Sequence, residues 1–121
     1  MSDKICIREL RVDAILGVLP HEREIPQPVI ISVEVEIDTR RAAATKELTD
    51  TLDYAALATK MSEQTIAGRY LLIETLAEDL ARLCFDHPAA SGARISVEKP
   101  HAVLDAQAVG IHIYREREAF S

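Results

Sequence analysis

The stretch of sequence that decides the fold reads Ala93-Arg94-Ile95-Ser96-Val97-Glu98-Lys99-Pro100. Its apolar residues fall on odd positions, so as a strand it would have one apolar and one polar face. Lys99 falls on the apolar side. Pro100 cannot donate to a strand ladder and favours an extended residue before it, so we expect the strand to end with Lys99.

Lys99 has two interpretations at that position. Partial burial would disfavour the ammonium form and turn the side chain into a proton donor and acceptor near neutral pH. Alternatively, the side chain extends along the apolar face and brings its charge to water, as most lysines at strand ends do. The strand alone leaves both interpretations open.

The same alternation predicts three more strands, in residues 4–15, 29–37 and 109–114. In the first of them the alternation changes phase, which is what one inserted residue does to a ladder. We therefore expect a bulge near Arg8 and Glu9. The residues expected to form a solvated tail are Glu116, Arg117 and Glu118.

Two helices are predicted between the second and third strands. One helical face is formed by Tyr54, Leu57, Ala58 and Met61. This helix ends at Gly68, and its possible N-caps are Thr49, Asp50 and Thr51. The second helix carries a broad apolar stripe of Leu72, Ile73, Leu76, Ala77, Leu80, Leu83 and Cys84. Residues 17–28 and 40–52 are expected to be polar connections, the second of them irregular.

The predicted order is strand, strand, helix, helix, strand, strand. Half-polar strands suit an antiparallel sheet that packs one face on helices. We therefore predict an α+β fold, with a four-stranded antiparallel sheet and two helices on one face, in a single domain over residues 1–121. Such a sheet has open edges, and joining sheets edge to edge in a symmetric ring removes them.

Composition limits the classes of function. The 121 residues are 48% hydrophobic and 28% charged, which is ordinary for a folded protein. A formal net charge of -6 argues against binding to nucleic acid or anionic membranes, because their phosphates would repel the protein. No apolar run reaches membrane-spanning length, and the start Met-Ser-Asp-Lys lacks the apolar segment of a secretory signal. We expect a cytoplasmic protein with free thiols at Cys6 and Cys84 and a small-molecule or protein partner.

Glu74 is a second candidate for chemistry. It lies off the apolar stripe in the first turn of the second helix, where the helix dipole stabilises a carboxylate. A carboxylate there could accept two parallel N–H donors from a flat heterocycle that carries an amino group beside a ring N–H. Alternatively, Glu74 only complements the dipole, with Glu78 and Arg82 as an ordinary surface pair.

Tyr54 and Glu22 are weaker candidates. The Tyr54 hydroxyl could relay a proton, although a tyrosine on an apolar stripe usually belongs to the core. Glu22, in the proline-rich connection, could hold a water or a substrate hydroxyl, or simply be solvated. The four histidines form no metal-binding pair, and glycine-rich phosphate loops and serine elbows are missing, so we expect no metal.

Taken together, four blocks of the sequence resemble the signature of dihydroneopterin aldolases. The blocks are Gly17-Val18-Leu19-Pro20-His21-Glu22, Asp50-Thr51-Leu52-Asp53-Tyr54, Leu72-Ile73-Glu74-Thr75-Leu76-Ala77-Glu78, and Glu98-Lys99-Pro100 followed by Val109-Gly110-Ile111. They occur in order, and the match runs from Ile5 to Tyr114. The resemblance implies the tunnelling fold, in which four subunits join their sheets into a barrel and two such rings stack as a homo-octamer.

The resemblance also implies an active site between neighbouring subunits, which uses neither a Schiff base nor a metal or other cofactor. Glu74 would anchor the amino group and ring N–H of a pterin. Lys99 and Tyr54, the latter from the neighbouring chain, would manage protons. Glu22 would lie near the hydroxylated side chain of the substrate. The other expected substrate contacts are Thr51, Leu52, Ile73 and His101.

The implied reaction is the cleavage of dihydroneopterin to hydroxymethyl-dihydropterin and glycolaldehyde, a step of folate biosynthesis. The pterin ring accepts the electrons once its nitrogen next to the side chain is protonated, so the protein supplies proton donors and acceptors. Reversal at the same bond would also allow epimerisation of the side chain to dihydromonapterin.

Two alternatives stay open. His101 stands where many aldolases carry a small residue, and the related dihydroneopterin triphosphate epimerases tend to have Lys-Leu-His there. A triphosphate would need several basic groups, whereas those near the expected site are Arg23, Arg69 and His101. The other alternative is a non-catalytic pterin-binding or ring-forming protein, which would not need all four proposed site side chains together.

Overall fold

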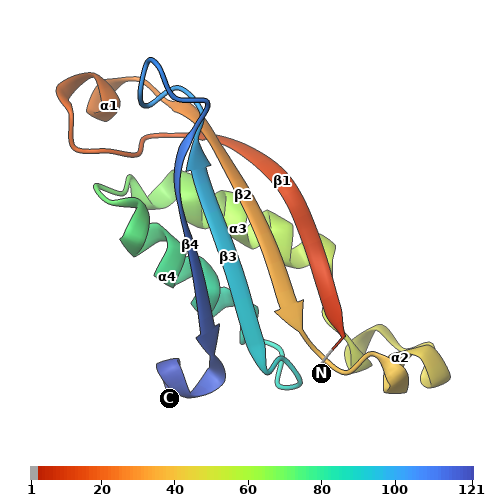
Figure 1. The fold of residues 1–121 in the computed structure, drawn as a ribbon. Coiled ribbons are helices and arrows are strands. Elements are labelled where there is room, and N and C mark those ends of the chain that lie inside the picture. The colour runs from red at the N-terminus through yellow and green to blue at the C-terminus, as the bar shows by residue number, and fades with distance from the viewer. Residues whose placement is uncertain (1–2) are drawn as a thin grey trace.

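The computed structural model describes residues 3–121 and contains a four-stranded sheet. Its strands are β1 (Lys4–Ala14), β2 (Gln27–Glu36), β3 (Gly92–Lys99) and β4 (Val109–Glu116). They pair antiparallel in the order β1-β2-β3-β4. Two helices, α3 (Tyr54–Gly68) and α4 (Ile73–Cys84), lie against one face of the sheet (Figure 1). None of the helices within residues 3–121 is both long and apolar enough to cross a bilayer. The predicted α+β fold is confirmed.

β1 contains the predicted bulge. Its pairing with β2 shifts between Ile7 and Leu10. Within the shift, Glu9 adopts a left-handed φ of 54°, and its amide donates to Ser32 Oγ at 3.0 Å. Because of the inserted residue, Ile7 and Leu10 both pack against the core although they are three positions apart.

The core lies between the sheet and the two helices. The inward positions of β2 and β3 are buried, as the alternation predicts, and they comprise Val29, Ile31, Val33, Val35, Ala93, Ile95 and Val97. The buried side chains of α4 are Leu76, Ala77, Leu80, Ala81 and Cys84. Leu72 is an exception to the predicted stripe, because it is the N-cap of α4 and is 51% exposed. Of the two free cysteines, Cys84 belongs to the core, whereas Cys6 is exposed.

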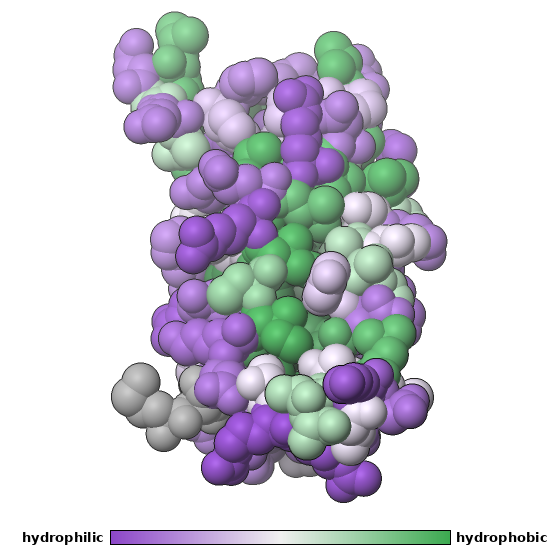
Figure 2. Space-filling model, turned by 90° about the vertical axis from the view of Figure 1, so that its right-hand side faces the viewer, coloured by the Kyte–Doolittle hydropathy of each residue, from purple (hydrophilic) through white to green (hydrophobic). Residues whose placement is uncertain are grey.

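The β1 side of the molecule keeps an apolar band. Figure 2 looks onto that side and shows hydrophobic residues gathered along its length, with hydrophilic residues along the left margin and a mixture on the right. The β1 side chains Ile5, Ile7 and Leu10 are only partly buried. One edge of the sheet therefore retains apolar side chains that a single chain does not fully cover.

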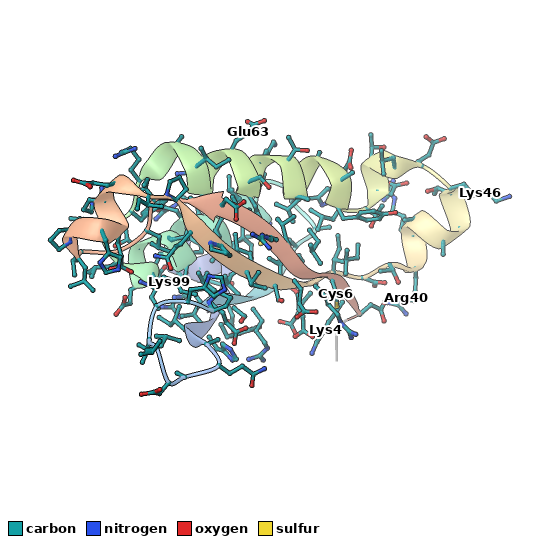
Figure 3. The ribbon with its side chains drawn as sticks, turned by 90° about the horizontal axis from the view of Figure 1, so that it is seen from above. Lys4, Cys6, Arg40, Lys46, Glu63 and Lys99 are labelled. Atoms are coloured by element: carbon teal, nitrogen blue, oxygen red, sulfur yellow. The ribbon has the colours of Figure 1, made fainter. Side chains whose placement is uncertain are left out.

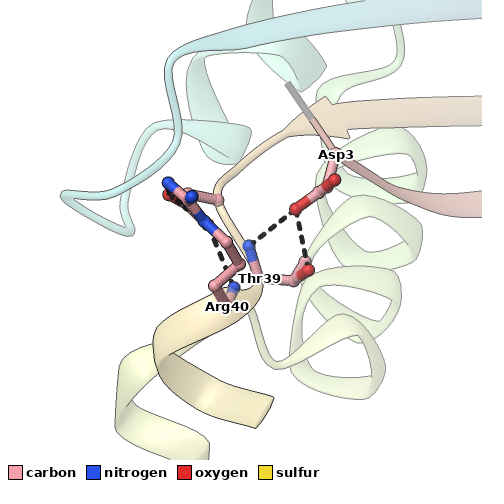
Figure 4. Close-up of polar contacts among 4 residues, drawn as sticks. Asp3, Thr39 and Arg40 are labelled. Atoms are coloured by element: carbon pink, nitrogen blue, oxygen red, sulfur yellow. Dashed lines mark hydrogen bonds and ion pairs between the residues drawn. The ribbon is translucent and has the colours of Figure 1, made fainter. Parts of the chain in front are cut away.

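The connections contain more regular structure than expected. A five-residue helix, α1 (Pro20–Glu24), lies in the first connection. The stretch expected to be irregular contains α2 (Arg40–Thr45) and the 3-10 turn Leu48–Asp50. Asp3 holds the start of α2, because its Oδ2 accepts from Thr39 N at 3.1 Å and from Thr39 Oγ1 at 2.9 Å (Figure 4). These hydrogen bonds lower the pKa of Asp3.

Two predictions about the ends of elements are wrong. Asp53 caps α3, because its Oδ1 accepts from Ala56 N at 3.1 Å. The side chains expected in this role do not cap the helix, and they are Thr49, Asp50 and Thr51. Arg117 is not part of a solvated tail, because its guanidinium donates to main-chain carbonyls that follow α4. Its acceptors are the carbonyls of Phe85, His87 and Ala90.

Candidate active site

Lys99 and Glu22 form a buried ion pair at one end of the sheet. β3 ends at Lys99, and Glu22 lies in α1, 77 residues away in the sequence. Lys99 Nζ donates to Glu22 Oε2 at 3.0 Å, and the two side chains are 12% and 7% exposed. Figure 3, seen from above, shows Lys99 at the end of the sheet where α1 lies. Lys99 therefore pairs its charge inside the protein and does not extend it into solvent.

Three donors converge on the Glu22 carboxylate. Besides Lys99, Gln27 Nε2 donates to Oε2 at 3.1 Å and Leu19 N donates to Oε1 at 3.3 Å. Burial raises the pKa of the Glu22 carboxyl, but the hydrogen bonds from Lys99, Gln27 and Leu19 outweigh burial and lower the pKa overall. Glu22 is therefore an ionised acceptor at neutral pH. Gln27 also donates to Leu16 O at 2.8 Å, so it fixes the orientation of the carboxylate.

Gly17 makes room for this carboxylate. Its φ of +135° is accessible to glycine and strained for other residues, and a Cβ atom there would collide with Glu22 Oε1. Gly17 N also donates to Tyr70 O at 3.0 Å. The glycine therefore brings the Glu22 segment against the connection between α3 and α4.

α4 starts at the end of the molecule where α1 lies (Figure 1), and Glu74 is in its first turn. Its side chain is exposed, and the preceding Ile73 is half-buried. The expected surface pair of Glu78 and Arg82 is wrong. The Glu78 carboxylate binds the Arg115 guanidinium of β4, and Arg82 pairs with Asp79 at 3.1 Å.

A small pocket opens beside Glu22. Its volume is about 160 Å³, and its lining includes His21, Glu22 and His101. Small-molecule sites typically enclose roughly 300–1,000 Å³. A single chain therefore offers only part of a site at this end of the sheet.

The remaining candidates, Thr51, Leu52 and Tyr54, lie at the opposite end of α3. Tyr54 is the first residue of that helix and is 62% exposed, so it is not a core residue. Thr51 and Leu52 line a separate pocket of about 390 Å³. Because α3 has 15 residues, it is about 22 Å long. Tyr54 is at its first turn, and its last turn, at Gly68, lies near α1 (Figure 1). Tyr54 and Lys99 are therefore far apart within one chain.

Sequence reasoning misses Gln27, and it names Arg23 only as a basic group near the site. Both side chains hold the Glu22 segment in place. Most of the hydrogen-bond acceptors of these two side chains are main-chain carbonyls. Every residue carries such a carbonyl, so the sequence does not reveal which ones are used. The one available signal is the position of Gln27 between two prolines of a connection that already contains a candidate acid. Within residues 3–121, no three His, Cys, Asp or Glu side chains gather as metal ligands would, and metal-free chemistry stays a prediction.

Comparison with known proteins shows the family of the chain. The family model for FolB, dihydroneopterin aldolase, matches residues 5–114. The structure of Escherichia coli dihydroneopterin aldolase in complex with neopterin has a TM-score of 0.87 at 33% identity, covering 93% of this chain and 98% of that chain. The Burkholderia thailendensis dihydroneopterin aldolase bound to guanine has a TM-score of 0.81 at 25% identity, covering 96% and 92%.

A longer relative also matches. The folic acid synthesis protein FOL1 of Dictyostelium discoideum is 30% identical over 118 residues, which cover 98% of this chain but 18% of that protein. The family model matches nearly the whole chain. The two bacterial structures have the same fold as this chain over almost their full length. The chain therefore belongs to the dihydroneopterin aldolase family, whose members are carbon–carbon lyases of folate biosynthesis.

Proposed function

We propose that the chain cleaves dihydroneopterin to hydroxymethyl-dihydropterin and glycolaldehyde, and that Lys99 and Glu22 act in the catalytic site. The observation that carries this proposal is the buried Lys99–Glu22 pair at the end of the sheet where α4 also starts. Buried ion pairs rarely add stability compared with well-packed apolar residues. A chemical role therefore explains this pair better than a structural one.

Glu74 would bind the pterin ring. The Escherichia coli relative was solved with neopterin and the Burkholderia relative with guanine. Both molecules present an amino group beside a ring N–H, so one carboxylate can accept two parallel hydrogen bonds from either. Glu74 is exposed in the first turn of α4, next to the positive end of the helix dipole. Main-chain groups near Ile73 would complete the contact.

The proposed cleavage moves electrons into the pterin ring. Protonation of the ring nitrogen next to the side chain makes the ring an electron acceptor. The hydroxyl on the second side-chain carbon loses its proton, the bond between the first two side-chain carbons breaks, and glycolaldehyde leaves. The carbon left behind then takes up a proton, and the ring nitrogen releases the proton that it had taken up. Ionised Glu22 would accept a hydrogen bond from the substrate hydroxyl, and Lys99, Tyr54 and water would carry the protons.

A second copy of the chain would complete the site. The pocket beside Glu22 measures about 160 Å³, and Tyr54 lies the length of α3 away from Lys99. The apolar side chains along β1 are only partly covered (Figure 2). These observations support a site completed by a neighbouring copy, which would supply Thr51, Leu52 and Tyr54. The octamer of two stacked four-subunit rings is what the resemblance to dihydroneopterin aldolases implies. The cytoplasmic location also stays a prediction.

The triphosphate epimerase is not favoured. The family model and the bacterial relatives are aldolases. The Arg23 guanidinium already binds three main-chain carbonyls, so Arg69 and His101 remain from the basic groups expected near the site. His101 borders the pocket beside Glu22, where it could contact the hydroxylated side chain of the substrate.

Turnover is the direct test. The purified protein is incubated with dihydroneopterin and, separately, with its triphosphate, and hydroxymethyl-dihydropterin, glycolaldehyde and side-chain epimers are measured. We expect cleavage of the unphosphorylated substrate. Turnover of the triphosphate alone would support the epimerase, and pterin binding without turnover would support a non-catalytic protein.

Lys99→Ala and Glu74→Ala separate catalysis from binding. We expect Lys99→Ala to abolish most turnover, while its affinity for neopterin falls less than that of Glu74→Ala. The reverse pattern would mean that the two roles are exchanged.

Mixing two inactive variants tests the shared site. If each site lies between two copies, mixed assemblies of Lys99→Ala and Tyr54→Phe chains contain an intact Lys99 opposite an intact Tyr54 at about a quarter of their sites. Activity should therefore reappear in the mixture. A mixture as inactive as either variant would mean that both side chains act from one chain.

A further inference from the structure

Arg23 links two segments that carry proposed site residues. Its Nη1 donates to Gly17 O and to Tyr70 O, both at 3.1 Å, and its Nη2 donates to Arg69 O at 2.9 Å. Arg69 Nη2 returns a hydrogen bond to Arg23 O at 3.4 Å. One planar guanidinium thus joins the α1 segment to the connection that leads into α4.

α1 needs such a link because apolar burial does not hold it. The helix has five residues, too few to be stable alone, and Glu22 is its buried residue. The flanking Leu19 and Ile25 are 48% and 65% exposed. The anchors of α1 are therefore polar, with Glu22 bound to Lys99 on β3 and Arg23 bound to the connection between α3 and α4.

Tyr70, whose carbonyl accepts from Arg23, is held firmly in the fold. Tyr70 is 8% exposed, and its hydroxyl lies between Gln64 of α3 and Asp79 of α4. Burial, together with the hydrogen bond to Asp79, raises the pKa of Tyr70, so the hydroxyl stays protonated and donates to the carboxylate. Arg23 therefore binds a carbonyl whose position is set by both long helices.

We propose that Arg23 is a positioning residue that fixes Glu22 relative to Glu74. The inference rests on the proposed function, in which Glu74 holds the edge of the pterin and Glu22 faces the hydroxyl group of the substrate. Without the guanidinium, α1 would keep its tether to Lys99 and the hydrogen bond from Gly17 N to Tyr70 O, but with fewer contacts it could shift relative to α4. A displacement of about 1 Å can lower a rate by ~100-fold, whereas the contact between Glu74 and the pterin edge would persist.

Arg23→Ala and Arg23→Lys test this role, with Arg40→Ala as a matched control. Arg40 is 87% exposed and contacts Asp38. We expect Arg23→Ala to lower kcat for dihydroneopterin by at least about tenfold and to change the Kd for neopterin by less than about threefold. Arg23→Lys should recover only part of kcat, because one ammonium cannot reproduce the forked guanidinium that reaches three carbonyls. Arg40→Ala should behave as the wild type.

Amide hydrogen exchange gives a readout that does not depend on turnover. In Arg23→Ala we expect faster exchange in residues 17–25 and unchanged exchange in α4, with a lower Tm because the hydrogen bonds to three carbonyls are lost. An Arg23→Ala variant with wild-type kcat and wild-type amide exchange would overturn the proposal. A variant that loses kcat, neopterin affinity and Tm in parallel would also overturn it. If the wild-type protein does not cleave dihydroneopterin, the proposed function fails, and the exchange rates still decide whether Arg23 holds α1.

Discussion

Lys99→Met would leave the Glu22 carboxylate buried without its cation. Methionine is unbranched and flexible like the lysine stem, so the variant removes the ammonium with little change in packing. Gln27 Nε2 and Leu19 N would still donate to the carboxylate. Removing one partner of a buried ion pair costs roughly 3–5 kcal/mol, and the retained donors place the expected loss at about 3 kcal/mol. For a chain of 121 residues this corresponds to a Tm that is lower by ~12 °C.

The loss of stability should depend on pH. In the wild type the pKa of Glu22 is lowered, so its ionised form stabilises the fold above the ordinary glutamate pKa. That stabilisation disappears as the pH falls through the lowered value. In Lys99→Met the Glu22 carboxylate keeps fewer hydrogen-bond donors, so burial raises the pKa of Glu22 relative to the wild type. Because protonated Glu22 carries no unpaired charge, the difference should be full at neutral pH and shrink toward about pH 4.

Urea unfolding followed by circular dichroism measures this difference. All samples need one protomer concentration, because assembly contributes to stability. Lys4→Met is the matched control, since Lys4 lies 4.0 Å from Glu34 with side chains 44% and 38% exposed, and such a pair contributes about 0–1 kcal/mol. The reasoning would be refuted if Lys99→Met were as stable as Lys4→Met. It would also be refuted if the loss of stability in Lys99→Met grew as the pH falls.

Three further substitutions test other parts of the fold. Gly17→Ala should displace the Glu22 carboxylate and strain the backbone, so we expect loss of most turnover and about 1–3 kcal/mol of stability. Asp53→Ala removes the cap of α3 and should cost about 1 kcal/mol in urea unfolding. Arg117→Ala breaks the hydrogen bonds to three carbonyls and should cost about 2 kcal/mol, with faster amide exchange in residues 85–90. An unchanged unfolding midpoint in any of the three would contradict its assigned contact.

Local periodicity predicts the sheet well, because the side chains of a strand alternate between neighbouring residues. The change of phase in residues 4–15 locates the bulge near Glu9, since one inserted residue moves every later side chain to the other face. Pro100 likewise marks the end of β3 at Lys99. Both features depend only on residues that are adjacent in the sequence.

Contacts between distant segments escape the same reasoning. The resemblance implies that Lys99 and Glu22 belong to one site, yet nothing in the sequence predicts that they form an ion pair across the 77 residues between them. Arg117 resembles a solvated residue, because its acceptors are main-chain carbonyls of another segment. α2 has no buried residue, so apolar periodicity cannot mark it. Capping by Asp53 depends on where the helix begins, and several neighbouring polar residues compete for that role.

The placement of the proposed site residues along the fold limits how they could act together. Lys99, Glu22 and Glu74 lie at one end of the molecule and Tyr54 at the other, separated by the length of α3, about 22 Å. A packed helix holds that distance, so no loop movement within one chain can bring Tyr54 to Lys99. A reaction that needs both side chains must therefore use two copies of the chain. Because every copy carries both ends, a closed ring of identical chains forms as many complete sites as it has subunits, whereas an open pair leaves ends unmatched.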